Sequence, residues 1–171
     1  SPSPSPSPTM TVFAMIVRQL ESSIAVPESE PPLRRLGAAG TLKNLLMAVE
    51  EAEDAPSWIL DLFLADHEIL RTVLKSISGA SPLVQPEALV RQAVAEALYF
   101  LTQSKRGRDA LWQCDGPEAM RKGYELEVHP GVCNAMEMFA QEILKHSEIE
   151  SALANSNTVS DVSGDKCCRA A

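Results

Sequence analysis

The chain has 171 residues, of which 45% are hydrophobic and only 5% aromatic, and its formal net charge is −8 at pH 7. This length predicts one domain with enough apolar residues to form a buried core. A negative protein repels phosphate groups, so nucleic acid and anionic membranes are poor candidates as partners.

Cysteine usage and hydropathy bear on the compartment. The four cysteines (Cys114, Cys133, Cys167 and Cys168) lie late in the chain and do not resemble a disulfide framework. No run approaches the roughly 18 apolar residues that a membrane-spanning helix needs. We therefore expect a cytoplasmic protein, with the nucleus as a second possibility. The chain begins with Ser1 rather than Met, which suggests a processed end or part of a longer protein.

The first segment predicts a tail followed by a helix. Ser1–Pro8 consists of four Ser-Pro dipeptides, and proline removes backbone donors and favours extended geometry. An unstructured tail is expected over residues 1–9. A helix is then expected from Thr9 or Thr11 to about Ser22, because apolar residues recur there at helical spacing.

Two short helices joined at a glycine are expected after the Pro-rich break at 27–32. Leu33–Ala39 has the pattern of a short helix, and Gly40 suits the turn that ends it. Thr41 is the predicted N-cap of a second helix that extends to about Ala52.

The middle of the chain predicts three more helices. One is expected to begin near Ser57. Asp66 is the predicted N-cap of the next, which carries a stripe of Ile and Leu residues and stops at Gly79. Pro86 suits the first turn of a longer helix that ends near Gln103.

The last helices are expected to be short, short and long. The segment 104–115 predicts a helix that Gly107 weakens. A turn is expected at Gly116, and 118–126 predicts another helix. A longer helix is expected from Pro130 to about Lys145, followed by a short amphipathic piece. Because no alternating strand pattern occurs, we predict an all-α domain over 10–154 and an unstructured tail over 155–171.

One apolar helical pattern occurs twice in this chain, at a step of 42 residues. The two copies are Val90, Ala93, Ala97, Leu98 and Leu101, and then Val132, Ala135, Phe139, Ala140 and Ile143. Repetition at about 40 residues is typical of helical solenoids, in which each unit buries its apolar face against its neighbours.

The segment Val90–Leu101 resembles the third helix of an armadillo repeat, and the short, short and long helices after it follow the same order. The junction around Gly40 looks like an earlier pair of first and second helices. This resemblance implies a right-handed α-solenoid of armadillo or HEAT-like units, clear over about 86–145 and partial before it. The chain is then either a small capped domain or the C-terminal part of a longer array, and we favour the second.

A scaffold that binds other proteins without catalysis follows from this resemblance. The predicted binding residues lie on the third helices: Arg91, Gln92, Glu96, Tyr99, Phe100, Asn134, Glu137 and Glu142. Their acidic members predict a basic or amphipathic partner segment. The Trp and Asn residues of armadillo proteins that bind import signals are absent from the matching positions Glu96, Phe100, Met138 and Glu142, so that mechanism is not expected.

The sequence is also compatible with three different functions. The chain could be the helical-repeat part of a chaperone adaptor of the myosin-chaperone type. It could be a lipid-anchored adaptor, since the last four residues match a prenylation pattern at Cys168, with Cys167 available for a second lipid. A helical enzyme would require His67 or His129 in a cleft beside a carboxylate.

The remaining candidate residues have simpler structural explanations. The sequence contains no phosphate-binding loop or paired-histidine metal motif, and no cofactor is predicted. Asp66, His67 and Glu68 suit a solvated helix start, and Cys114, His129 and Cys133 form a weak zinc candidate. The basic cluster Lys105, Arg106 and Arg108 is expected to compensate the dipole of the preceding helix. Trp58 and Trp112 would be partner anchors if they were exposed.

Overall fold

The computed structural model describes residues 10–25, 32–50, 58–79 and 84–161, with side chains over 12–20, 33–49, 58–79 and 84–149. Within these ranges the chain forms eight α-helices and no β-strand, which confirms the all-α prediction. The helices are α1 (Met10–Ala25), α2 (Pro32–Glu50), α3 (Trp58–Leu64), α4 (His67–Lys75), α5 (Ala88–Thr102), α6 (Lys105–Gln113), α7 (Gly116–Leu126) and α8 (Pro130–Asp161).

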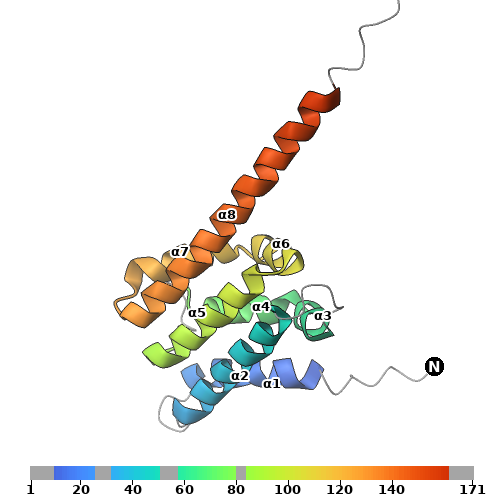
Figure 1. The fold of residues 1–171 in the computed structure, drawn as a ribbon. Helices are drawn as coiled ribbons and strands as arrows, with labels where there is room; N and C mark the ends of the chain where they lie inside the picture. The colour runs from blue at the N-terminus through green and yellow to red at the C-terminus, as the bar shows by residue number, and fades with distance from the viewer. Residues whose placement is uncertain (1–9, 26–31, 51–57, 80–83, 162–171) are drawn as a thin grey trace, which may run out of the picture.

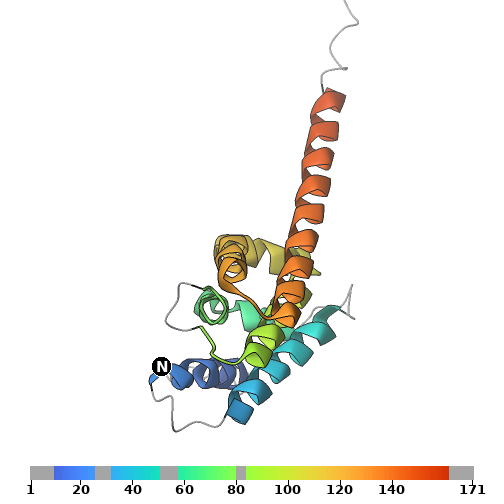
Figure 2. The same cartoon turned by 90° about the vertical axis from the view of Figure 1, so that its left-hand side faces the viewer.

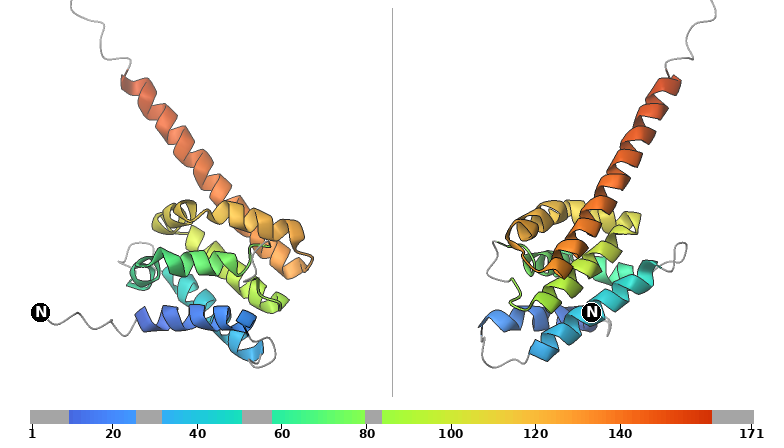
Figure 3. Two further views of the ribbon diagram at one scale, coloured as in Figure 1. Left: turned by 180° about the vertical axis from the view of Figure 1, so that it is seen from behind. Right: turned by 60° about the vertical axis from the view of Figure 1, so that its left-hand side comes forward.

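The helices pack in rows that follow chain order. In one row α2 packs against α5, and α5 packs against α8. In a second row α1 packs against α4, and α4 against α7, while α3 contacts α6. Helices α1 and α2 consequently lie at one side of the molecule and α6, α7 and α8 at the opposite side, with α3, α4 and α5 between them (Figures 1 and 3).

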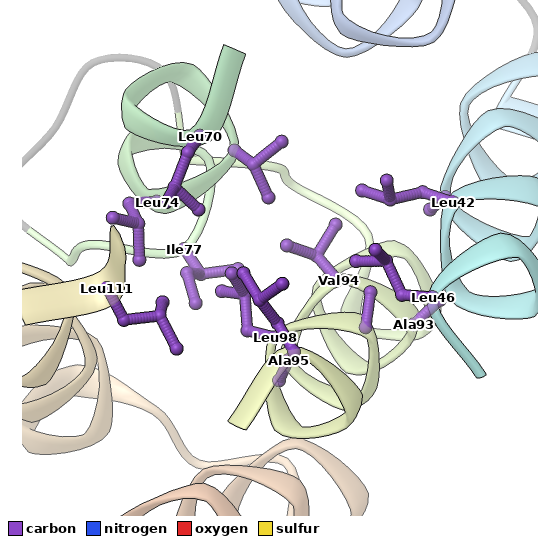
Figure 4. Packing of buried hydrophobic residues seen from close by; sticks show 14 of the residues in the cluster. Leu42, Leu46, Leu70, Leu74, Ile77, Ala93, Val94, Ala95, Leu98 and Leu111 are labelled. Atoms are coloured by element: carbon purple, nitrogen blue, oxygen red, sulfur yellow. The ribbon is translucent and has the colours of Figure 1, made fainter. Parts of the chain in front are cut away.

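The hydrophobic core lies between these rows. Leu70 of α4, Leu111 of α6 and Leu98 of α5 point toward one another, and Leu42 and Leu46 of α2 approach α5 from the other side (Figure 4). All five side chains are 0% exposed. Burial of a leucine side chain contributes about 1.5–3 kcal/mol, so this shared core holds helices from both rows together.

Two side-chain caps define where helices begin. The Asp66 carboxylate accepts a hydrogen bond of 2.9 Å from the backbone N–H of Glu68, which confirms the predicted cap of α4. The Ser104 hydroxyl accepts one of 3.0 Å from the N–H of Gly107 at the start of α6. A Cβ at Gly107 would lie 2.0 Å from the Leu101 carbonyl oxygen, so this glycine allows α6 to approach the end of α5.

The turn before α7 differs from the prediction by one residue. Asp115 adopts the left-handed conformation (φ 56°), and Gly116 is already the first residue of the helix. Gly116 is buried, and a Cβ on it would lie 2.9 Å from the Leu111 carbonyl oxygen. The glycine therefore serves close packing, while Asp115 makes the turn.

The predicted break at Gly40 is wrong. Helix α2 is continuous from Pro32 to Glu50, and it lies in the row of α5 and α8 rather than forming a pair of short helices. Thr41 does not cap a helix: its hydroxyl donates a hydrogen bond of 2.8 Å to the carbonyl of Gly37, one turn earlier. Tertiary packing along α2 outweighs the helix-breaking tendency of a single glycine.

The predicted end of the last helix is also wrong. Helix α8 is continuous through Lys145 and Asn155 to Asp161, where two pieces and a tail were expected. Its second half extends beyond the packed helices (Figures 1 and 2). Residues 1–9 and 162–171, which include the predicted Ser-Pro tail and the C-terminal cysteines, lie outside the described residues.

Candidate functional site

A groove on the row of α2, α5 and α8 is the candidate site, and we call it the Tyr99 groove. Its volume is about 300 Å³. It is lined by Lys43 and Met47 of α2, Glu96, Tyr99 and Phe100 of α5, and Ala135 and Met138 of α8. Each of the three helices of the row thus contributes side chains to one surface.

The groove combines an apolar wall with a pair of opposite charges. The rings of Tyr99 and Phe100 are 5.4 Å apart between centroids, in a tilted arrangement. The Lys43 ammonium lies 3.0 Å from the Glu96 carboxylate, with both side chains about one-third exposed (34% and 29%). Gln92 donates a hydrogen bond of 2.9 Å to the same carboxylate. Both charged groups line the groove and are partly exposed, so a ligand in the groove can contact them.

Five of the eight predicted binding residues belong to this surface or support it. Glu96, Tyr99 and Phe100 line the groove, and Gln92 holds Glu96. The Asn134 amide lies 3.7 Å from the sulfur of Met138. The structure therefore places these five residues on α5 and on one turn of α8, at or next to the groove.

Arg91 has a different position from the one predicted. Its guanidinium donates hydrogen bonds of 2.7 and 3.0 Å to the two oxygens of Glu127, and two of 2.8 Å to the carbonyls of Gln85 and Pro86. Only 16% of the Arg91 side chain and 5% of the Glu127 side chain are exposed. Arg91 therefore joins α5 to the loop before α8 and does not line the groove.

The remaining two predicted residues also lie elsewhere. Glu137 lines a second groove, where it accepts a hydrogen bond of 2.7 Å from the Tyr124 hydroxyl. Glu142 pairs with Lys145 at 3.2 Å and His146 at 2.9 Å on α8 itself. The eight residues therefore do not form one surface, because successive positions along a helix point in different directions.

Two residues that line the groove, Lys43 and Met47, are not among the predicted binding residues. Both lie on α2, whose sequence predicts a pair of short helices outside the row of third helices. Met138, at a position that matches the armadillo groove pattern, also lines the groove and is not among the predicted binding residues. Because α2 is one long helix in the row of α5, it forms this wall of the groove.

Two further apolar grooves lie at opposite sides of the molecule. The Trp112 groove, of about 440 Å³, lies among α6, α7 and α8 and is lined by Trp112, Pro117, Met120, Arg121, Tyr124, Met136, Glu137, Phe139, Ala140, Ile143 and Leu144. The Met15 groove, of about 280 Å³, lies between α1 and α2 and is lined by Val12, Met15, Ile16, Gln19, Arg34 and Ala38.

The basic cluster after α5 has structural partners, and one of its residues, Arg108, has the predicted role at the end of α5. The Arg108 guanidinium donates hydrogen bonds to the carbonyls of Thr102 (2.8 Å) and Gln103 (3.4 Å) at the C-terminal end of α5. Arg106 pairs with Asp61 at 2.6 Å, and Lys105 pairs with Asp109 at 3.3 Å. Cations at a helix C-terminus compensate its dipole, as expected for Arg108.

The described His, Cys, Asp and Glu residues do not form a metal-binding cluster. Where side chains are described, no three His, Cys, Asp or Glu residues are placed to hold a metal ion together. Cys114 is buried, and this burial raises the pKa of its thiol. The Cys133 sulfur lies 3.8 Å from the Glu127 carbonyl oxygen, and the Nδ1 atom of His129 is buried without a hydrogen-bond partner.

No known family, no curated protein and no solved structure matches this chain. In the part of the chain that the structure describes, every helix is too short or too polar to cross a membrane. The observations therefore define a class: an all-helical protein whose ordered rows of helices carry a groove with apolar and charged side chains.

Proposed function

We propose that this protein is a non-enzymatic binding scaffold that holds an amphipathic or basic segment of another protein in the Tyr99 groove. The observation that carries this proposal is the groove itself. It places two aromatic rings and two methionines beside the Glu96 carboxylate, on a surface to which three helices contribute. Methionine side chains adapt to different ligand shapes, and aromatic residues contribute strongly to interfaces.

We further propose that the helices form a short armadillo-like solenoid. The row of α2, α5 and α8 supports this interpretation, because every third helix takes the next position in the row. The two copies of the apolar pattern lie on α5 and α8, which are adjacent there. A row of similar helices presents a long surface that suits an extended or helical peptide.

The predicted partner chemistry follows from charge. The chain carries a net charge of −8, and Glu96 offers a carboxylate within the groove. Complementary charge raises the association rate and favours basic segments over acidic ones. Lys43 beside Glu96 can interact with a carboxylate of the ligand, so a segment of mixed charge with an apolar face also fits.

Fluorescence anisotropy tests this proposal with labelled peptides of three kinds: basic amphipathic, acidic amphipathic and scrambled basic. We expect the basic amphipathic peptides to bind best. Met138→Glu in the Tyr99 groove should weaken this binding about tenfold or more, since it places a charge on the apolar wall. Leu144→Glu, the same kind of change in the Trp112 groove, is the matched control and should leave binding unchanged. Equal binding of all three peptide classes, or loss only with the control, would contradict the proposal.

The lipid-anchor, chaperone-adaptor and enzyme interpretations have less support. Cys167 and Cys168 lie outside the described residues, and mass spectrometry of the C-terminal peptide tests for a lipid there. The chaperone-adaptor and enzyme interpretations have no specific observation in their favour.

A further inference from the structure

One face of α5 combines a carboxylate with two aromatic rings. Glu96 lies three positions before Tyr99 and four before Phe100, so the three side chains share one face of the helix, and all three line the Tyr99 groove. The two rings are 5.4 Å apart between centroids and tilted by 57°. A guanidinium group can pair with a carboxylate and stack on an aromatic ring at the same time, so this face suits an arginine side chain.

The Glu96 carboxylate is oriented by a contact with the start of α8. The Gln92 amide donates a hydrogen bond of 2.9 Å to the Oε1 atom of Glu96. Gln92 is itself confined by the first turn of α8, because a Cβ at Gly131 would lie only 2.4 Å from the Gln92 side-chain oxygen. A carboxylate oxygen has two lone pairs, so Oε1 can accept a second hydrogen bond while Gln92 holds it.

The other oxygen of this carboxylate is occupied by Lys43 of α2. The Lys43 ammonium lies 3.0 Å from the Oε2 atom of Glu96, and 34% of the Lys43 side chain is exposed. Among the described side chains, Glu96 is the only ion-pair partner of Lys43. Lysine is a point charge on a flexible stem, whereas the planar fork of arginine binds both oxygens of a carboxylate at once. An incoming arginine therefore offers Glu96 more hydrogen bonds than Lys43 does.

Two methionines form apolar walls beside the ion pair. Met47 of α2 and Met138 of α8 line the groove, and each is 38% exposed. The helix α5 lies between α2 and α8 in the row, so the two methionines come from opposite sides of Glu96 (Figure 3). The stem of an arginine is apolar and can lie along such side chains while its guanidinium reaches the carboxylate.

We propose that the Tyr99 groove selects an arginine of its partner segment, and that this arginine replaces Lys43 on Glu96. The inference rests on the proposed binding function of the groove and names the side chain that the groove recognises. The guanidinium pairs with both oxygens of Glu96 and stacks on the adjacent aromatic rings, and its stem lies between Met47 and Met138. A lysine of the partner would only repeat the contact that Lys43 already makes, so it gains little from the exchange.

Fluorescence anisotropy with two labelled amphipathic peptides tests this proposal. The peptides share the same apolar residues and contain no acidic ones, and every cation is arginine in one peptide and lysine in the other. Equal charge makes the general attraction to a chain of net charge −8 the same for both. We expect the wild type to bind the arginine peptide about tenfold more tightly, because only a guanidinium gains the second hydrogen bond and the ring contact.

Two variants with matched controls identify the residues responsible. Glu96→Gln should remove the preference for arginine, and Glu137→Gln in the Trp112 groove is its control and should keep the preference. Lys43→Met should strengthen binding of the arginine peptide about threefold, because it removes the group that competes for Glu96. Lys122→Met on α7 removes the same charge outside the groove and should leave the affinity unchanged. Circular dichroism would show that each variant keeps its helices.

The outcomes separate arginine selection from the binding function on which it rests. Equal affinity of the wild type for the two peptides, with Met138→Glu still weakening both, would overturn arginine selection and leave the binding function intact. A preference that persists in Glu96→Gln, or an affinity that Lys43→Met lowers or leaves unchanged, would also overturn it. If neither peptide bound the wild type, or if Met138→Glu had no effect on binding, both proposals would be wrong.

Discussion

Arg91 and Glu127 join the start of α5 to the loop between α7 and α8 through two hydrogen bonds of 2.7 and 3.0 Å. The Arg91 guanidinium lowers the pKa of Glu127 from its ordinary 4.5 to about 2, and the backbone N–H groups of Val128 and His129 act in the same direction. The carboxylate is thus held charged in the folded chain. Because Glu127 also accepts hydrogen bonds from the N–H groups of Val128 (3.0 Å) and His129 (2.9 Å), the pair holds the segment just before α8 against the start of α5.

This ion pair predicts a specific acid sensitivity. A carboxyl group whose pKa is lower in the folded state stabilises the fold above its unfolded pKa of 4.5, and this contribution is lost as the pH falls from 4.5 toward 2. The size of the shift corresponds to about 3 kcal/mol. Glu127→Gln should therefore reduce the free energy of unfolding at pH 7 by about this amount and flatten its pH dependence below pH 4.5, as urea denaturation at several pH values would measure.

The matched control for that experiment is Glu125→Gln. Glu125 pairs with Arg121 on the surface of α7, and both side chains are 56% exposed. Exposed pairs contribute about 0–1 kcal/mol, so the control should change stability little. If the two variants lost equal stability, the structural role of the Arg91–Glu127 pair would be wrong.

Substitution of glycine by alanine should have opposite effects on stability at two pairs of positions, and the first pair is Gly107 and Gly123. A Cβ would lie 2.0 Å from the Leu101 carbonyl oxygen at Gly107 and 2.4 Å from that of Ile77 at Gly123, so alanine there must displace a neighbouring backbone. We expect Gly107→Ala and Gly123→Ala to destabilise the fold by about 2 kcal/mol or more.

Gly37 and Gly40 provide the contrast. Nothing lies within 4 Å of a Cβ at either position, and both lie inside α2. Alanine should stabilise the protein there by about 0.5–1 kcal/mol, because it lowers the entropy of the unfolded chain. Thermal unfolding followed by circular dichroism would compare all four variants. A loss of stability with Gly40→Ala would support a turn at that position and contradict a continuous α2.

The helix caps predict a third set of effects. Asp66→Ala and Ser104→Ala each remove a side chain that accepts a backbone hydrogen bond at a helix start, and each should cost about 1 kcal/mol. Thr41→Ala is the comparison, since Thr41 bonds back to Gly37 inside α2 and caps nothing. Its effect should stay within about 0.5 kcal/mol, as chemical denaturation would show. If Thr41→Ala lowered the free energy of unfolding as much as Asp66→Ala, this would support a helix start at Thr41 and contradict a continuous α2.

We expect Cys114 to react slowly with thiol reagents in the folded chain. Burial raises the pKa of its thiol and hides the sulfur, while the nearby Arg71 opposes this shift only in part. Alkylation with iodoacetamide at pH 7, followed by mass spectrometry of the peptides, should label Cys114 much more slowly in the folded chain than in urea. Equal rates in the two states would show that the α6–α7 turn opens readily.

Local signals in the sequence were sufficient for the helical class, for the cap at Asp66 and for the repeated apolar helices around Val90 and Val132. These features depend on residues that are close together in the chain. The 3.6-residue periodicity of apolar residues indicates the helices, and a carboxylate just before the first N–H groups of a helix indicates the cap. The lack of alternating apolar residues argues against strands. Each of them acts within one helical turn, so no tertiary contact is needed to recognise it.

Tertiary structure alone decided the continuity of α2 and the composition of the Tyr99 groove. Gly40 lowers helix propensity by about 1 kcal/mol, and burial of Leu42 and Leu46 against α5 outweighs that local cost. The position of Arg91 likewise cannot be predicted from local sequence. Its partner Glu127 is distant in the chain, and only packing brings the two side chains together. Helical periodicity predicted which faces are buried, whereas the order of the rows decided which exposed side chains share one surface.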